Sequence, residues 1–344
     1  MRATTIHAPF DIRLSEVPDP KIQLPTDAVV KIVAGCICGS DLWPYRGENA
    51  ITPPGRRIGH EYVGIVQEVG ADVRTVKSGD FVVTPFLASD GTCPNCLAGM
   101  TAACLNQVSI GGPDADGGQG EYARVPYADG TLVATPEVPD DSLVPSLLTL
   151  SDVMGTGWHA ARSARVKPGD TVVVVGDGAV GLCGVLAAVR MGAERVVALS
   201  RHETRQKVAT EFGATHIIAE RGDEARTAVL DLTAGLGADA VLECVGTAQA
   251  MTTAFEVARP GATVGFVGVP HGVEVPIGTM FSRNVGLAGG LAPARAYLPE
   301  LMADVLSGEI NPGLVFDQEL PLAEVAEGYR SMHERRAIKT LLRP

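Results

Sequence analysis

Short apolar runs alternate with longer helix-compatible segments through the middle of the chain. The runs predict strands at Thr171–Val175, Arg195–Leu199, His216–Ile218, Ala238–Leu242 and Thr263–Val267. The segments between them predict helices at Ala179–Met191, Glu203–Phe212, Asp223–Thr233 and Ala248–Ala258, each ending near a glycine (Gly192, Gly213, Gly235 and Gly261). A strand followed by a crossover helix, repeated at this spacing, predicts an α/β domain with a doubly wound parallel sheet, the Rossmann type of nucleotide-binding architecture.

The segments on either side of this region have a different pattern. Short alternating runs at Ala28–Val33, Tyr62–Val69 and Asp80–Thr84, separated by turns rich in Pro and Gly, predict an antiparallel, partly barrel-like β domain. Near the C-terminus, helices are expected at Leu298–Leu306 and Leu322–Met332, and a last strand at Ile338–Leu342. We expect this tail to return to the first domain and to leave a cleft between the two domains. The expected domains are residues 1–154 with 293–344, and residues 155–292.

Composition and charge narrow the function. The 344 residues carry a formal net charge of -12, which would repel a nucleic acid or an anionic membrane, so a small-molecule partner is expected. The most apolar stretch, 171–189, contains Asp177 and four glycines and does not resemble a membrane span. The first ten residues lack a signal-peptide core, and the cysteine count of seven is odd. These features favour a reduced, cytoplasmic protein in which cysteines bind metal.

A glycine-rich turn follows the first strand of the expected parallel sheet. Gly176, Gly178 and Gly181 form a GxGxxG sequence, with Ala179 and Val180 opening the next helix. In this position glycines allow a pyrophosphate to approach the backbone, and the helix N-terminus offers unpaired N–H groups. The alternative is an ordinary tight turn, because the motif alone is weak.

The end of the second strand bears on the choice between NADP and NAD. NAD sites place an acidic residue there for the ribose diol, whereas this chain has Ser200, Arg201 and His202. A hydroxyl and a guanidinium suit a 2′-phosphate, and Arg205 could supply a second positive group. NADP is therefore favoured over NAD, and the alternative is a solvated basic helix start.

Metal-binding residue types occur in two groups. Cys38, His60 and Asp152 are far apart in the sequence, and together they make a mixed set of donors that suits a zinc ion with an open position. Taken singly, the cysteine could be a core residue, the histidine could be held by a hydrogen bond, and the aspartate could cap a helix. The second group is compact: Asp90, Cys93, Cys96 and Cys104 lie in a loop rich in Gly and Pro, where a structural zinc is the expected use and an empty loop is the alternative.

The sequences Cys38-Gly-Ser-Asp-Leu42 and Gly59-His-Glu61 resemble the zinc-site signatures of the zinc-dependent medium-chain alcohol dehydrogenases, and the resemblance extends over essentially the whole chain. It implies that the first domain is a GroES-like β-barrel. It also implies that Cys38 and His60 bind a catalytic zinc, with Glu61 as an exchangeable ligand and Asp41 orienting His60. In some bacterial NADP-dependent secondary alcohol dehydrogenases the third zinc ligand is an aspartate. Residues 148–157 are similar to the segment that carries it, which implies that Asp152 is the third ligand here.

The same resemblance suggests roles for further residues. Thr156 and the backbone at Val245, Val267 and Val269 are expected to contact the nicotinamide half, and Lys339 the cofactor phosphates. Ser40 is expected to relay the alcohol proton, while Trp43 replaces the usual relay histidine and lines either the substrate pocket or the core. In the structural zinc loop, Asp90 replaces the first of four cysteines. Cys36 is expected to be a core residue, and relatives suggest a homo-oligomer, with a tetramer favoured over a dimer.

These features predict an enzyme that moves a hydride between an alcohol (a secondary alcohol, a polyol or a sugar) and NADP, giving a ketone or an aldehyde. Zinc lowers the pKa of bound water to about 7 and would stabilise an alcohol oxygen as it loses its proton. Two alternatives are a zinc-free NADPH quinone or enone reductase with the same fold, and a non-catalytic protein that binds NADP and zinc.

Overall fold

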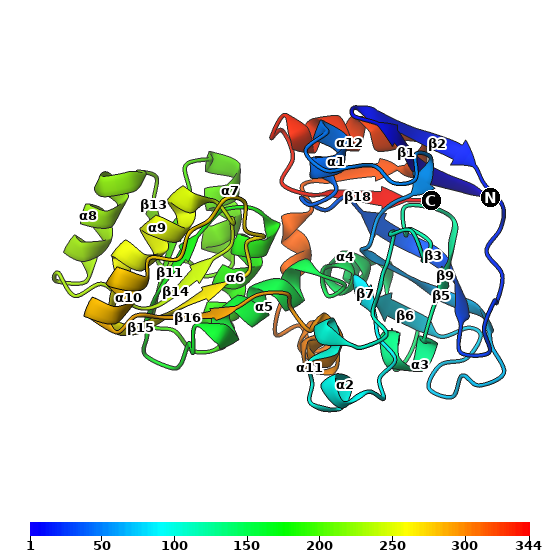
Figure 1. Cartoon of the computed structure of the whole chain (residues 1–344), viewed down its shortest axis with the longest axis horizontal. Coiled ribbons are helices and arrows are strands. Elements are labelled where there is room, and N and C mark those ends of the chain that lie inside the picture. Colours follow the sequence, from blue (N-terminus) through cyan, green and yellow to red (C-terminus); the bar gives the residue numbers. More distant parts are fainter. The chain divides into compact units, whose positions relative to one another are not determined.

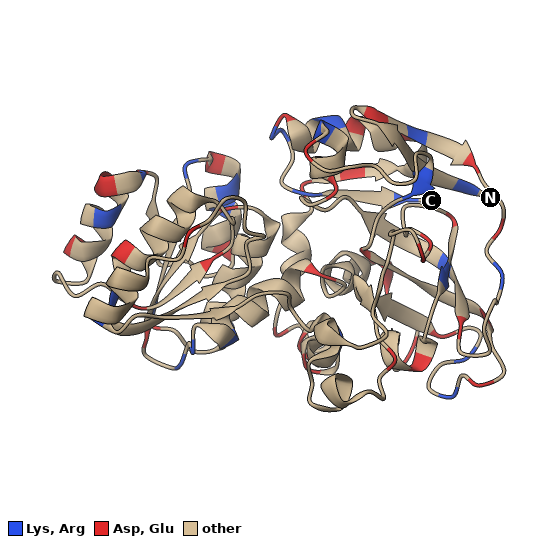
Figure 2. Ribbon diagram, in the orientation of Figure 1, with Lys and Arg blue, Asp and Glu red and all other residues tan.

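A computed structural model describes residues 1–344, which form two compact units. The first unit comprises Met1–Asp152 and Pro293–Pro344, and the second comprises Val153–Ala292. Figure 1 shows both. No helix is long and apolar enough to cross a membrane. Acidic and basic residues are interspersed along the ribbon in both units (Figure 2).

The second unit contains one parallel sheet of six strands in the order β13-β12-β11-β14-β15-β16. The strands are β11 (Thr171–Val175), β12 (Arg195–Leu199), β13 (His216–Ile218), β14 (Ala238–Glu243), β15 (Ala258–Phe266) and β16 (Gly286–Gly289). The helices are α5 (Val153–Ser163), α6 (Ala179–Arg190), α7 (Glu203–Glu211), α8 (Gly222–Leu232), α9 (Ala248–Val257) and α10 (Ile277–Arg283). Figure 1 shows α8, α9 and α10 over one face of the sheet and α5, α6 and α7 over the other, which confirms the doubly wound prediction.

The buried residues of these strands explain why the sheet forms. Residues 172–175 of β11 and 196–199 of β12 are buried without interruption, as expected for parallel strands covered by helices on both faces. The prediction for β15 was too short, because this strand begins at Ala258, where it pairs with Ala238 before an irregularity in the register.

The first unit is built mainly from antiparallel strands. Its main sheet has seven strands in the order β10-β6-β5-β3-β18-β17, with β9 also paired to β3. These strands are β3 (Ala28–Cys36), β5 (Tyr62–Val69), β6 (Phe81–Thr84), β9 (Tyr122–Val125), β10 (Val133–Ala134), β17 (Gln318–Pro321) and β18 (Thr340–Arg343). Smaller sheets join β1 (Arg2–Ala8), β2 (Asp11–Glu16) and β4 (Arg56–Arg57), and join β7 (Leu87–Ala88) to β8 (Val108–Ser109).

Short helices complete the first unit. The α-helices are α1 (Leu42–Arg46), α2 (Pro94–Leu97), α3 (Ala128–Thr131), α4 (Val144–Thr149), α11 (Ala294–Leu306) and α12 (Val325–His333). The 3-10 helices are η1 (Thr101–Ala103), η2 (Asp141–Leu143), η3 (Pro312–Val315) and η4 (Leu322–Glu324). The expected helix over 322–332 is therefore divided into η4 and α12.

The C-terminal segment belongs to the first unit. β18 pairs antiparallel with β3, through Leu341 opposite Cys36, and parallel with β17. α12 packs with the helix α1, the side chains of Tyr45 and Tyr329 contributing to one apolar cluster. The tail thus pairs with strands of the first unit, and this pairing places Lys339 beside the end of β3.

Close helix packing in the second unit gives a first prediction. A Cβ added at Gly157 of α5 would lie 2.5 Å from the backbone nitrogen of Gly184 in α6, whereas one at Gly278 of α10 would meet nothing within 4 Å. Gly157→Ala is expected to lower the free energy of unfolding by about 1–3 kcal/mol, since the two helices must separate. Gly278→Ala serves as the control and is expected to be neutral or stabilising by up to about 1 kcal/mol. Denaturant unfolding of both variants measures the difference, and equal stability would contradict the packing.

Candidate active site

Four candidate metal ligands converge within the first unit. The ligand atoms of Cys38, His60, Glu61 and Asp152 all lie within 4.8 Å of one another. Cys38 follows the end of β3, His60 and Glu61 immediately precede β5, and Asp152 follows α4. Since β3 and β5 are neighbours in the sheet, pairing of these strands brings the first three ligands together.

The spacing of these atoms fits a tetrahedral ion. The Asp152 Oδ2 atom lies 3.7 Å from Cys38 Sγ and 3.4 Å from His60 Nε2. Donor atoms that are each about 2.0–2.3 Å from a tetrahedral zinc would be about 3.3–3.8 Å apart. The sulfur, nitrogen and oxygen atoms are therefore spaced as ligands of one ion.

The electrostatics of this cluster also favour a cation. Burial opposes the charged form of His60, but the neighbouring Asp41 and Cys38 outweigh burial and raise the pKa of the imidazole well above its usual range. Burial and the Glu61 carboxylate raise the pKa of the Cys38 thiol. Acidic groups are thus crowded at one point, where Lys339 neutralises only Glu61, and a divalent cation would supply the remaining positive charge.

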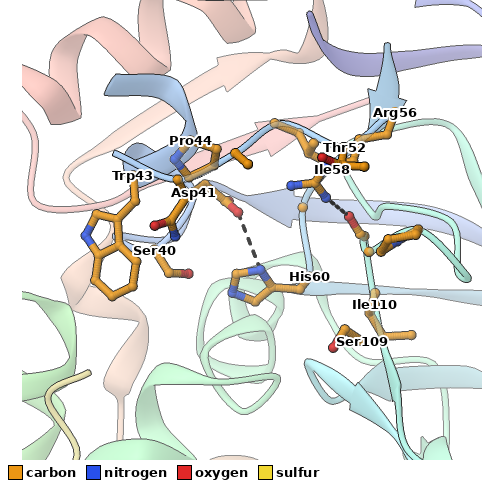
Figure 3. Close-up of a pocket in the computed structure, with 16 residues that line it drawn as sticks. Ser40, Asp41, Trp43, Pro44, Thr52, Arg56, Ile58, His60, Ser109 and Ile110 are labelled. Carbon is orange, nitrogen blue, oxygen red and sulfur yellow. Dashed lines mark hydrogen bonds and ion pairs between the residues drawn. The ribbon is translucent and has the colours of Figure 1, made fainter. Parts of the chain in front are cut away.

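A chain of hydrogen bonds holds His60. Its Nδ1 atom lies 3.4 Å from Asp41 Oδ1 (Figure 3), so Nε2 is the nitrogen that faces Asp152. Asp41 Oδ2 accepts hydrogen bonds from the Cys38 backbone N–H at 3.0 Å and from Gln119 Nε2 at 3.2 Å. Tyr329 in turn donates its hydroxyl to Gln119 Oε1 at 3.1 Å. The expected position of Asp41 behind the imidazole is found, whereas Gln119 and Tyr329 were not anticipated from the sequence.

Lys339 lies elsewhere than expected. Its ammonium is buried within the first unit, 2.7 Å from Glu61 Oε1 and 3.2 Å from the Ile37 carbonyl oxygen, so its partners in this structure belong to the chain, and its contact with cofactor phosphates stays a prediction. Glu61 Oε2 accepts a bond from Cys36 Sγ at 3.2 Å, and Oε1 is 4.0 Å from His60 Nε2. An exchangeable metal bond to Glu61 therefore stays a prediction, and it would compete with the Lys339 ion pair.

A cavity of about 460 Å³ opens beside His60. Ser40, Trp43 and Arg56 contribute to its wall, together with Gly111 and its neighbours (Figure 3). The two alternatives for Trp43 were the substrate pocket and the core, and the structure places it in the cavity wall. Ser40 lines the same cavity as His60, which is the position that proton transfer would require.

The compact group of four forms a separate cluster. Cys93, Cys96 and Cys104 are buried against one another, and their sulfur atoms and an Asp90 oxygen all lie within 4.8 Å. The Sγ atoms of Cys93 and Cys104 are 3.9 Å apart, so the two cysteines are free thiols and not a disulfide. The backbone N–H groups of Asp90 and Asn106 both donate to Cys104 Sγ at 3.3 Å, which fixes this sulfur beside the other two.

Asp90 has a structural role as well as a possible role as a ligand. Its Oδ1 accepts the backbone N–H groups of Thr92 and Cys93 at 2.8 and 2.9 Å, and its Oδ2 accepts Asn106 Nδ2 at 2.8 Å. These bonds, led by the one from Cys93, hold the pKa of Asp90 well below its usual range. The carboxylate stays ionised and close to the sulfur atoms, so the residues fit a zinc ion held by one oxygen and three sulfurs.

In the second unit, the glycine-rich turn has the geometry expected of a phosphate cradle. Gly176 has a φ of 117°, which favours glycine, and a Cβ at Gly181 would lie 2.0 Å from the Gly176 carbonyl oxygen. Gly178 precedes the first turn of α6, where Ala179 and Val180 lie, and a Cβ there would meet nothing within 4 Å. The turn is closed by tight packing on one side and left open in front of the helix N-terminus.

Residues expected to bind the nicotinamide half lie in the same unit. Val245 follows β14, and a Cβ at Gly176 would be 2.7 Å from its Cγ2 atom. Val267 and Val269 follow β15, and Thr156 lies in α5. A small cavity at the carboxyl ends of the strands is lined by Gly176, Val245 and residues of the α9 N-terminus. Ligands of this type of fold bind at that edge.

Asp177 contacts the residues that follow β12, which were expected to bind the 2′-phosphate of NADP. Ser200 donates its hydroxyl to Asp177 Oδ2 at 2.9 Å, and Arg205 Nη1 lies 3.2 Å from Asp177 Oδ1. Arg205 is thus paired within the chain, and its expected role as a second positive group for the cofactor stays a prediction that would compete with this ion pair. Arg201 is exposed. The position of Asp177 inside the GxGxxG sequence was the available signal for this pairing.

Comparison with known proteins places the chain in a family. The model of the alcohol dehydrogenase GroES-like domain matches residues 24–140, and that of the zinc-binding dehydrogenases matches residues 179–307. A zinc-type alcohol dehydrogenase B of Aspergillus flavus is 34% identical, with 100% of this chain and 81% of the relative covered. This chain belongs to the zinc-dependent medium-chain alcohol dehydrogenase family.

Solved structures of the family agree with this assignment. An alcohol dehydrogenase from Thermus sp. ATN1 has a TM-score of 0.93 and 33% identity, with 100% of this chain and 99% of that chain covered. A zinc-binding dehydrogenase from Sinorhizobium meliloti, solved with NADP, has a TM-score of 0.86 and 28% identity, with coverage of 100% and 99%. Several relatives are named as zinc-type or zinc-binding alcohol dehydrogenases, and membership of this family favours the dehydrogenase over the zinc-free reductase alternative.

The compact cluster can be tested by zinc analysis. Cys104→Ser is expected to lower the zinc content by about one ion per chain, because a tetrahedral structural site needs all four ligands. The melting temperature should fall as well, since the loop loses its cross-link. Cys183→Ala, a buried cysteine of the second unit outside both clusters, is the control and should keep its zinc. An unchanged zinc content in Cys104→Ser would show that this loop binds none.

Proposed function

We propose that this protein is an alcohol dehydrogenase that transfers a hydride between the CH–OH carbon of an alcohol and NADP, giving a ketone or an aldehyde. The observation that carries the proposal is the convergence of Cys38, His60 and Asp152 beside a cavity of about 460 Å³. Cavities of this size accommodate small organic molecules.

The metal-binding residues would hold the ion as follows. Cys38, His60 and Asp152 would be its ligands, and three protein ligands leave a position open for the substrate. When bound, zinc would act as a Lewis acid toward the substrate oxygen. Asp41, through its contact with His60 Nδ1, fixes the tautomer in which Nε2 can serve as a ligand.

Proton movement falls to residues of the cavity wall. The alcohol must lose a proton as well as a hydride, and a serine hydroxyl can accept one proton while donating another. Ser40 shares the cavity with His60, so it is suited to take the alcohol proton. Trp43 has no group able to continue the relay, so the proton must leave through water or cofactor hydroxyls.

The second unit would supply the dinucleotide. The open space in front of Gly178 and the N-terminus of the twelve-residue helix α6 would hold the pyrophosphate. NADP is supported by the exposed Arg201 and by the lack of an acidic residue directly after β12. Asp177 is unfavourable for NADP, because its carboxylate would repel a nearby 2′-phosphate. It also already accepts bonds from Ser200 and Arg205.

A non-catalytic protein that binds NADP and zinc is the remaining alternative, and turnover separates it from the proposal. Asp152→Ala is expected to lower kcat/KM for a panel of alcohols by ~100-fold or more, because one of three ligands is removed. Asp140→Ala, an exposed aspartate of the same unit, is the control. Absorbance of the reduced cofactor gives the rate. Full activity after complete removal of zinc would refute the mechanism.

Cofactor choice gives a separate prediction. Arg201→Ala is expected to lower kcat/KM for NADP by ~10-fold or more and to leave that for NAD nearly unchanged, since a charge-assisted bond to the 2′-phosphate is lost. Asp177→Asn should shift the ratio of NADP to NAD in the opposite direction, because repulsion is removed and Arg205 is released. If wild type prefers NAD and Arg201→Ala leaves the ratio unaltered, the NADP assignment fails.

A further inference from the structure

The cavity beside His60 contains very few charged groups. Among the residues that line it, Arg56 is the single guanidinium or ammonium and Asp41 the single carboxylate. Asp41 is already engaged, because it contacts His60 Nδ1 and accepts bonds from Cys38 N–H and Gln119. Figure 3 shows Arg56 and His60 in the wall of one cavity. The Arg56 guanidinium is therefore the one charged group of the lining for which an anionic partner has to be identified.

Arg56 has no anionic partner in the chain. It forms no ion pair, and its one hydrogen bond runs from Nη1 to the Gly111 carbonyl oxygen. Its Nε atom is buried and has no hydrogen-bond partner. Beyond the Gly111 carbonyl, no group of the chain accepts a hydrogen bond from the guanidinium, although the side chain is partly enclosed.

The adjacent arginine differs from Arg56 in having an anionic partner. Arg57 follows it in β4 and points to the opposite side, as successive residues of a strand do. Arg57 lies 3.0 Å from Asp116 Oδ1 and donates to the Pro18 carbonyl oxygen at 3.0 Å. One arginine of the pair is neutralised within the chain, and the other faces the cavity with its charge uncompensated.

An enclosed charge without a counter-ion is unfavourable, and a bound anion would compensate it. The planar guanidinium matches carboxylate and phosphate groups, which accept two of its N–H bonds at once. A neutral alcohol would not satisfy this group. The net charge of -12 makes the point stronger, because an anionic ligand needs a local positive charge to approach this chain.

We propose that Arg56 binds an anionic group of the substrate, so that the substrate class is alcohols and aldehydes that carry a carboxylate or a phosphate, with hydroxy acids as the first choice. This inference rests on the proposed alcohol dehydrogenase function, since it assigns the specificity of the same cavity. The reacting hydroxyl faces the His60 side of the cavity, and the acidic end of the same molecule lies at Arg56.

A purely structural role for Arg56 would be to brace the segment around Gly111. That role uses the bond from Nη1 to the Gly111 carbonyl, and it gives no reason for a charged group, because an amide side chain could donate the same bond. Arg56→Gln therefore removes the charge and keeps a donor. Arg57→Gln is the matched control, since it removes an equal charge from the neighbouring residue outside the cavity lining.

The test compares 4-hydroxybutanoate with its uncharged counterpart 4-hydroxybutanamide. The wild-type holoenzyme is expected to prefer the acid in kcat/KM by ~10- to 100-fold, as for one charge-assisted bidentate contact. Arg56→Gln should lose most of this preference through a higher KM for the acid, while values for the amide change little. Arg57→Gln should keep the preference. Substitution of 3-hydroxypropyl phosphate for the acid shows which anion is preferred.

A binding measurement gives a second readout that does not depend on turnover. Calorimetry with butanoate and butanamide should show tighter binding of the anion to wild type and to Arg57→Gln, with the difference lost in Arg56→Gln. Butanoate that bound only to the metal would bind all three proteins equally, and that result would overturn the proposal. So would equal kcat/KM for acid and amide in wild type, or an equal loss for both in Arg56→Gln.

Failure of the proposed function would give a different combination of turnover and binding results. If wild type oxidised neither alcohol but still bound butanoate in a manner that depends on Arg56, the dehydrogenase assignment would fail and the anion site would stand. If wild type oxidised neutral alcohols and showed no dependence on Arg56, the enzyme assignment would stand and the anion site would fail.

Discussion

The first unit depends on a cluster of groups that repel one another. Cys38, Glu61 and Asp152 are acidic groups held with His60 inside a space less than 5 Å across. Burial makes such a cluster costly unless positive charge is supplied. The chain supplies part of it through Lys339, which neutralises Glu61 from behind, and the surrounding network of Asp41, Gln119 and Tyr329 fixes the ring of His60. The rest of the charge is left to a metal ion.

The strand order of the main sheet in the first unit explains how this cluster is held together. β3 and β5 are neighbours, so the residues that follow one strand and precede the other meet at the same edge. β18 lies on the other side of β3, and this position brings Lys339 underneath Glu61. Three segments that are far apart in the sequence therefore meet because adjacent strands share an edge.

Local patterns allowed much of the fold to be predicted. Alternation of apolar runs with helical segments located five of the six strands and four of the six helices of the second unit, because these parallel strands are buried on both faces and these helices end at a strong stop signal. The same patterns could not locate Gln119 or Tyr329, since an amide or a phenol has no characteristic spacing and its partner lies tens or hundreds of residues away. Lys339 was assigned by resemblance to a position on the cofactor, whereas its surroundings depend on the pairing of β18, which sequence patterns do not show. The ion pair of Arg205 was not anticipated for a different reason, because its partner Asp177 was treated as part of a glycine turn and not as a charge.

The strand β18 also has a consequence for how the molecule is made. The second unit is continuous in the chain and has all of its strands once residue 292 has been synthesised. The main sheet of the first unit lacks β17 and β18 at that stage, and Glu61 lacks Lys339. On a translating ribosome, the part of the chain that emerges first is therefore the part that finishes last. Its exposed β3 edge must wait for the C-terminus, and an interrupted or truncated product would display that edge to other chains.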